Sequence, residues 1–223
     1  MSVIDNVVEL RKKLAYSQEE IADKLGVSRQ TYSKMENKES SLNMEQLEVL
    51  SGFFGIPMTE FFFGVENTEK FRQMYLYVLK YFRGSGVPKT KLAKLLYLVD
   101  FNHYYNYLES MSGALYKCKE YGPVADSFLE LTDSLYEEGQ IKIDCLSMGA
   151  QMISVPSQLE NIDFCLLSKE DKKEIDDICK KWEDANTQTI VNFTHHQKPW
   201  MSCRPNEVIP YELILQEDPD HVY

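Results

Sequence analysis

The stretch that decides the N-terminal fold is SQEEIADKLGVSRQTYSKME, residues 17–36. Ser17 is a good N-cap and Glu20, three residues later, completes a capping box, so a helix is expected to begin here. Gly26 suits the left-handed conformation just past a helix end, and Ser28 caps a second helix. The pattern predicts two short helices joined by a glycine turn, the arrangement with which many repressors hold a helix against DNA.

The second of these helices carries side chains suited to reading DNA. One face holds two i,i+4 pairs without an acidic or apolar member: Arg29, Gln30, Ser33 and Lys34. Arginine pairs with guanine, glutamine with adenine, and serine with several bases. We therefore expect Arg29 and Gln30, in the first turn, to meet base edges. The alternative is an ordinary solvated helical hairpin, in which the same residue types are unremarkable.

The stretch closely resembles the Cro and lambda-repressor-like helix-turn-helix family, often called XRE-like, over about residues 3–63. Caps and apolar spacing around it predict further helices at about 3–14, 43–54 and 59–63, which gives the five helices of that family. The resemblance implies that the glutamine opening the preceding helix, here Gln18, also contacts DNA. Positions near the recognition helix that can reach phosphates are Ser28, Lys34 and Asn37.

The charge balance separates the two parts of the chain. The whole sequence has 24 basic and 35 acidic residues, a net charge of −11 that disfavours DNA. Residues 1–64 hold 7 basic and 10 acidic residues, and the remainder holds 17 and 25. The N-terminal part is therefore nearly balanced, and its positive charge can gather on one side: Arg11, Lys12, Lys13, Arg29, Lys34 and Lys38. With few phosphate contacts, useful affinity calls for a homodimer on double-stranded operator DNA.

The cysteines and the apolar segments indicate a cytoplasmic protein. Five cysteines are scattered without C-x-x-C spacing, as expected for reduced thiols. The first residues lack the basic start and apolar run of a secretory signal. No apolar stretch approaches the ~20 residues that span a membrane.

The second part of the chain, from about residue 68, reads as a separate helical domain. Apolar periodicity and caps predict helices at about 71–82, 92–107, 128–138, 168–182 and 187–195, and a last one from 210. A short strand is expected at 113–118, a turn at 121–124, a β-hairpin at 141–155 and a frayed tail at 217–223. The aromatic stripe of residues 71–82 is either core, a packing surface between domains or a dimer contact. The fold class is thus mainly α (α+β): a five-helix domain over 1–64 and a helical domain with a small antiparallel sheet over 68–223.

Five short motifs of this second part look like the Panacea family of antitoxin domains, which includes SocA-like proteins. They are KLLYLVD at 94–100, GALY at 113–116, YGPV at 121–124, THHQKPW at 194–200 and IPYE at 209–212. The match spans about residues 70–215 and rests on the order and spacing of the motifs. It implies a domain that binds and neutralises a toxin encoded next to it. Some family members carry an N-terminal DNA-binding domain, and one type instead delivers its toxin to a protease.

A search for catalytic or metal-binding patterns returns little. The sequence has no nucleophile elbow, phosphate-binding loop, H-E-x-x-H or dinucleotide fingerprint. His195, His196 and Cys203 suggest a metal, but adjacent helical histidines point about 100° apart, and structural zinc needs four ligands. His103, among tyrosines, reads as a packed or hydrogen-bonded surface histidine. We expect no enzyme, no cofactor and no metal.

The sequence as a whole predicts an antitoxin that captures a neighbouring protein toxin and represses its own operon. Aromatic residues that are candidates for the toxin contact are Tyr104, Tyr121 and Trp200, although each also suits a core position. The alternative function is a transcriptional repressor whose C-terminal domain senses a ligand or only dimerises.

Overall fold

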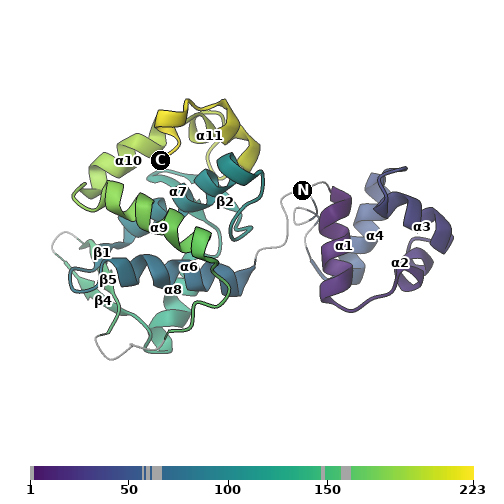
Figure 1. Ribbon diagram of the computed structural model, residues 1–223, viewed down its shortest axis with the longest axis horizontal. Coiled ribbons are helices and arrows are strands. Elements are labelled where there is room, and N and C mark those ends of the chain that lie inside the picture. The colour runs from purple at the N-terminus through teal and green to yellow at the C-terminus, as the bar shows by residue number, and fades with distance from the viewer. Residues whose placement is uncertain (1–2, 57, 59–60, 62–66, 147–148, 157–161) are drawn as a thin grey trace. The chain divides into compact units, whose positions relative to one another are not determined.

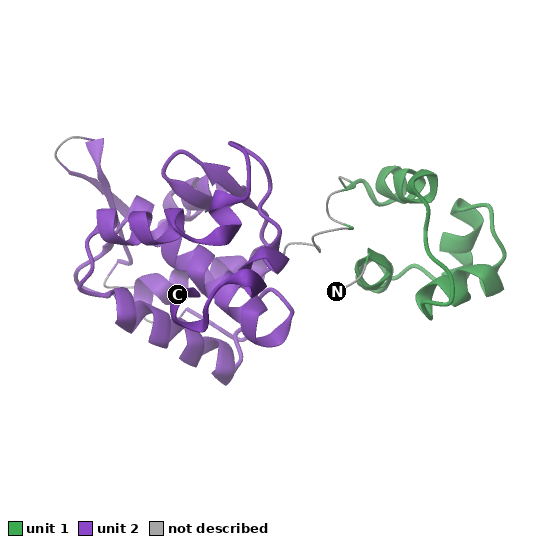
Figure 2. Ribbon diagram, turned by 90° about the horizontal axis from the view of Figure 1, so that it is seen from above, with its two compact units in different colours: residues 1–66 green, residues 67–223 purple. Residues whose placement is uncertain are grey.

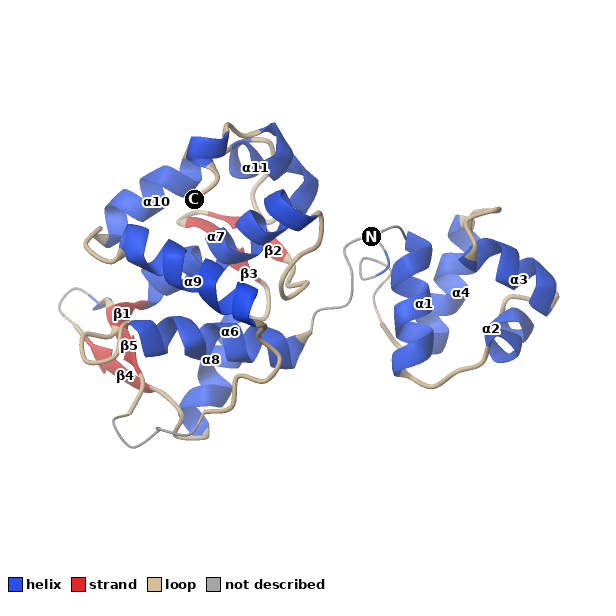
Figure 3. Ribbon diagram, viewed as in Figure 1, coloured by secondary structure: helices blue, strands red, loops and turns tan. Residues whose placement is uncertain are grey.

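The computed structural model describes residues 3–56, 58, 61, 67–146, 149–156 and 162–223. It is mainly helical with two small antiparallel sheets, which confirms the predicted fold class (Figure 1; Figure 3). The chain divides into two compact units, residues 1–66 and 67–223 (Figure 2). Each unit encloses a hydrophobic core of its own.

Unit 1 contains the two predicted helices of the quoted stretch and the helices on either side of them. Its described helices are α1 (Val3–Lys13), α2 (Gln18–Lys24), α3 (Arg29–Glu36) and α4 (Met44–Phe54). The capping box of Ser17 and Glu20 is present, and Gly26 has a φ of 66° as the turn requires. The helix expected at 59–63 lies outside the described residues except for Phe61, which is buried in the core of this unit.

Unit 2 is built around one buried helix. Its helices are α6 (Thr68–Tyr81), α7 (Lys89–Tyr107), α8 (Phe128–Glu137), α9 (Lys169–Trp182), α10 (Thr187–His195) and α11 (Lys198–Met201). Every residue of α7 from Lys91 to Asn102 is buried, because α6, α9 and α10 all pack against it. The aromatic stripe of α6 is buried inside this same unit, so it is core and not a dimer contact.

The two sheets of unit 2 differ from the sequence prediction in two places. The predicted hairpin is present as β4 (Lys142–Cys145) and β5 (Gln151–Ser154), and β1 (Val87–Pro88) adds a third strand that was not predicted. The second sheet pairs β2 (Tyr116–Lys119) with β3 (Gly122–Ala125). The expected turn at 121–124 is therefore mostly a strand, in which Pro123 is tolerated because the described β3 pairs on one side only.

The C-terminal segment is ordered, contrary to the expected frayed tail. It forms two 3-10 helices, η2 (Tyr211–Gln216) and η3 (Pro219–His221), where a single last helix was predicted. The side-chain amide of Gln197 donates to the carbonyl oxygens of His221 and Val222, at 2.8 and 2.9 Å. Val222 is only 1% exposed, so burial of its side chain adds to these bonds. No helix among the described residues is both long and apolar enough to cross a membrane.

Candidate DNA-reading helix and partner surface

One face of helix α3 is buried in the core of unit 1, and the opposite face is exposed to solvent. Tyr32 and Met35 are buried in the core of unit 1. The side chains of Arg29, Gln30 and Lys34 are exposed and make no hydrogen bond or ion pair with other described residues. On the predicted reading face, these three side chains therefore point to solvent, and their hydrogen-bond donors are available to DNA. Ser33, the fourth residue of this face, is half-buried.

The first turn of α3 is held by Ser28. Its Oγ accepts a hydrogen bond from the backbone N–H of Thr31 at 3.1 Å and also lies 2.9 Å from the Thr31 hydroxyl. This cap places Arg29 and Gln30 at the exposed N-terminal end of the helix, the end that meets base edges in helix-turn-helix proteins. Asn37 is exposed at the other end, as the C-cap.

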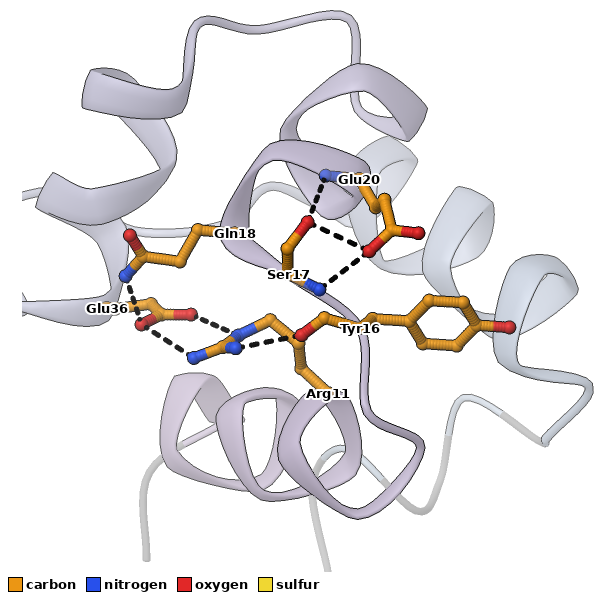
Figure 4. A network of polar contacts seen from close by, with 6 residues as sticks. All are labelled: Arg11, Tyr16, Ser17, Gln18, Glu20 and Glu36. Atoms are coloured by element: carbon orange, nitrogen blue, oxygen red, sulfur yellow. Dashed lines mark hydrogen bonds and ion pairs between the residues drawn. The ribbon is translucent and has the colours of Figure 1, made fainter.

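A polar network ties α3 to the two preceding helices (Figure 4). Arg11 of α1 donates through Nε to Glu36 Oε1 at 2.7 Å and through Nη1 to the carbonyl of Tyr16 at 2.9 Å. Gln18 of α2 donates to Glu36 Oε2 at 2.8 Å. Burial opposes ionisation of Glu36, but the hydrogen bonds from Gln18 and Arg11 outweigh it and keep the pKa of this carboxyl below its usual value.

Three side chains for which the sequence suggested a role toward DNA have partners within unit 1: Gln18, Arg11 and Lys38. The amide of Gln18 uses one N–H to hold α2 against α3, so the side chain is fixed at the junction of the two helices. Arg11 is committed to Glu36, and Lys38 pairs with Asp5 at 2.9 Å, so neither adds an unpaired positive charge as the sequence suggested.

The positive charges left for DNA are fewer than the sequence suggested. Of the six basic residues that the sequence analysis placed on one side of unit 1, four are exposed and form no ion pair with a described residue: Lys12, Lys13, Arg29 and Lys34.

In unit 2, two of the three aromatic residues proposed for a partner lie on elements that contact each other, the β2–β3 hairpin and α11. Tyr121, at the tip of the β2–β3 hairpin, is 66% exposed. Trp200 of α11 donates from Nε1 to the carbonyl of Lys119 at 3.3 Å, two residues from Tyr121 along the chain. Met201, next to Trp200, is 57% exposed. The hairpin and α11 thus meet at Lys119, Tyr121 and Met201 are each exposed, and Trp200 is half-buried between α11 and the hairpin.

Tyr104, the third aromatic candidate, packs at a different place in unit 2. Its ring stacks on Tyr211, with 5.5 Å between ring centroids. Burial, and then the nearby carboxylate of Glu212, raise the pKa of Tyr104. Tyr104 thus lies at the edge of the core, packed within its own unit.

A buried lysine supports the hairpin, a feature that the sequence analysis missed. Lys94 of α7 is fully buried and donates from Nζ to the carbonyl of Pro123 at 2.7 Å. Desolvation lowers the pKa of Lys94 to about 7. Gly122 has a φ of 92°, and a Cβ there would lie 2.7 Å from Lys94 Cε. The only signal in the sequence was a lone lysine within a run of apolar residues.

His195 and His103 each contact a neighbouring side chain within unit 2. His195 stacks on Trp200 with 4.1 Å between ring centroids, and burial, then the charges of Lys94 and His196, lower the pKa of His195. His103 lies 2.7 Å from Glu174 through Nδ1, in agreement with the hydrogen-bonded histidine that we expected. Among the described residues, no three His, Cys, Asp or Glu side chains gather as a metal ion would need.

Comparison with known proteins identifies two families along the chain. Residues 7–61 match the helix-turn-helix family model, and residues 92–201 match the model of the SocA-like antitoxin, Panacea domain. No curated protein and no solved structure gave a match. The match over 7–61 contains all of α2 and α3, and the match over 92–201 contains Lys94, Tyr121 and Trp200. The chain thus carries a helix-turn-helix domain followed by a SocA-like Panacea domain, and it is a DNA-binding protein of the antitoxin type.

Proposed function

We propose that this chain is the antitoxin of a toxin–antitoxin system. In this proposal, unit 2 neutralises a protein toxin encoded next to it by direct binding, and unit 1 represses the shared operon. The observation that carries the proposal is the succession of a helix-turn-helix match and a Panacea match in one chain whose two units have separate cores. Neither role requires catalysis.

For repression, α3 enters the major groove with its first turn. Arg29 and Gln30 contact base edges, and Ser33 lies one turn further along the same face. Phosphates are contacted by Lys34, Asn37 and the cap at Ser28, with Gln18 beside them. Few unpaired basic residues face DNA, so two copies of the chain bind two half-sites of a palindrome as a homodimer.

For neutralisation, Tyr121 and Trp200 are the proposed anchors. Large aromatic side chains dominate binding energy where a partner buries them, and Tyr121 has most of its surface available. Trp200 is held by its stack on His195 and its bond to Lys119, so it loses little freedom on binding. Tyr104 contributes less, because Tyr211 already covers one face of its ring.

The test is co-expression of the full chain with the neighbouring gene. Growth rescue and a complex on size exclusion are expected for the wild type, and Tyr121→Ala with Trp200→Ala should lose both. Tyr136→Ala is the matched control, because Tyr136 is an exposed tyrosine on α8, outside this surface. Rescue by the double variant at wild-type level would remove the hairpin surface from the proposal. Failure of the wild type to bind or rescue would remove the antitoxin function itself.

A further inference from the structure

A groove of about 390 Å³ lies in unit 2 between the C-terminal half of α7, helix α9 and the C-terminal segment. Its aromatic lining consists of Tyr105, Tyr107 and Tyr223, and its acidic lining of Glu170, Glu174 and Asp177. Lys173 is the one basic side chain among the described lining residues. The groove thus combines tyrosine rings with an excess of carboxylates.

One carboxylate holds the walls of the groove together. Glu174 of α9 receives hydrogen bonds from three side chains of α7: Asn102, His103 at 2.7 Å and Asn106 at 3.2 Å. These bonds cross-link the two helices, so the groove is formed before any ligand arrives.

The other two carboxylates are available to a ligand. Glu170 and Asp177 are exposed and make no hydrogen bond or ion pair with described residues. They lie four residues before and three after Glu174, on the same face of α9. Neither forms an ion pair with Lys173, the basic residue between them, so carboxylates outnumber the positive charge at the mouth of the groove.

The tyrosines offer ring faces to a cation, and the chain already uses one of them in this way. Lys181 Nζ lies 4.9 Å from the ring centroid of Tyr223 and also donates to the carbonyl oxygen of that residue. Tyr107 is 56% exposed and rests on the ring of His103, at 4.7 Å. A guanidinium group stacks on such rings and forms paired hydrogen bonds with carboxylates, which a compact ammonium does less well.

We propose that this groove binds an arginine-bearing basic segment of the toxin. The proposal rests on the proposed function and names a second contact beside the hairpin surface. Charge complementarity supports this occupant, since residues 65–223 hold 17 basic and 25 acidic residues. One side of the groove, formed by Pro219, Val222 and Tyr223, lies beyond the residues matched by the Panacea model. The choice of toxin thus depends in part on residues outside the matched stretch.

The groove is tested first without the toxin. The probe is N-acetyl-arginine amide, titrated into the isotope-labelled full chain and followed by amide chemical shifts, with N-acetyl-norleucine amide as the uncharged probe. Glu170→Lys with Asp177→Lys removes the free carboxylates. Glu130→Lys with Glu137→Lys, two exposed positions on α8 without a polar partner among the described residues, changes the net charge equally.

With the arginine probe, we expect saturable changes of amide chemical shift at residues 102–107 and 170–177 in the wild type and in the α8 variant (Glu130→Lys with Glu137→Lys). The groove variant should show none. The inference is overturned if the arginine probe gives no saturable shifts there, or if the groove variant responds as the wild type does.

The second arm uses the protein product of the neighbouring gene. The groove variant (Glu170→Lys with Asp177→Lys) should bind this protein about tenfold more weakly than the wild type, chiefly through slower association. Tyr107→Ala should weaken the binding less. Equal binding by the wild type and the groove variant overturns the inference and leaves the proposed function standing. If the wild type binds the arginine probe in the groove and does not bind that protein, the proposed function fails while the ligand class of the groove is supported.

Discussion

Arg29 is the residue whose loss should report most directly on DNA reading. It is exposed in the first turn of α3 and has no partner among the described residues, so truncation leaves the fold of unit 1 unchanged. Arg29→Ala should lose about 1–3 kcal/mol of discrimination at one base position. Mobility shifts on the gene's own promoter, with each base of the half-site varied, measure this.

Lys12→Ala is the control for this prediction, because Lys12 is exposed on α1, outside the reading helix, and its loss should change the affinity for all sequences to the same extent. Unchanged base preference for Arg29→Ala would take this residue off the reading face.

Lys94 should make the stability of unit 2 rise with pH above neutrality. Its pKa is lowered by burial from 10.5 to about 7, so between these values the unfolded chain binds more protons than the folded chain. The free energy of unfolding therefore rises with pH in this window, by at most about 1.4 kcal/mol per pH unit from this group. Below pH 7 both states are protonated and the unfavourable contribution of the buried charge is fully present.

The measurement is urea unfolding between pH 7 and 9.5 of the wild type and Lys94→Met. As pH rises, the free energy of unfolding of the wild type should increase relative to that of Lys94→Met. Lys180→Met replaces an exposed lysine on α9, and its free energy of unfolding should follow pH in parallel with that of the wild type. Parallel curves for Lys94→Met as well would contradict the assigned pKa shift.

At the scale of elements, local signals predicted the helices well because their caps are made by neighbouring residues. The capping box predicted at Ser17 is present, and Ser168 begins the helix predicted at 168–182 with a capping box of its own. Strand β3 was missed, since glycine and proline disfavour strands locally. Strand β3 pairs with the neighbouring β2, and a hydrogen bond from a residue further away along the chain, Lys94, holds it against α7. The ordered tail was missed because its partner is Gln197.

The candidate sites show the same division between local and distant signals. The reading face of α3 follows from helical spacing alone, so the exposure of Arg29 and Gln30 could be predicted. That α11 lies against the hairpin carrying Tyr121 depends on the contact between Trp200 and Lys119, which are 81 residues apart in sequence, and local spacing carries no record of such a contact. The commitment of Arg11 to Glu36 was hidden in the same way.

Gly122→Ala tests how tightly the hairpin lies on α7. Alanine at φ 92° is strained, and its Cβ would approach Lys94 Cε to 2.7 Å. The matched control is Gly84→Ala, where φ is 97° and nothing lies within 4 Å of the added Cβ. The difference between the two losses of unfolding free energy isolates the contact with Lys94, and we expect Gly122→Ala to cost about 1–3 kcal/mol more. Equal losses in chemical denaturation would show that strain alone acts at position 122.

For the whole molecule, we expect unit 2 to neutralise the toxin without unit 1. Residues 67–223 enclose a core of their own, so a chain starting at residue 67 should fold. Co-expressed with the neighbouring gene, it should rescue growth and form a stable complex, while repression of the promoter is lost. The full chain serves as the positive control. A folded truncated chain that neither binds nor rescues, beside a full chain that does both, would assign part of the capture to residues 1–66.

The bond between Arg11 and Glu36 has a consequence for how the protein responds to ionic strength. Both side chains are nearly buried, at 12% and 11% exposure, so mobile ions have little access to the pair. The contacts proposed for Lys34 and Arg29 with DNA, by contrast, would compete with counterions around the phosphates and weaken steeply as salt is added. A rise in salt should therefore release the operator while the geometry of α3 persists. The operon would be derepressed by a protein that remains folded and ready to rebind as soon as the salt is diluted.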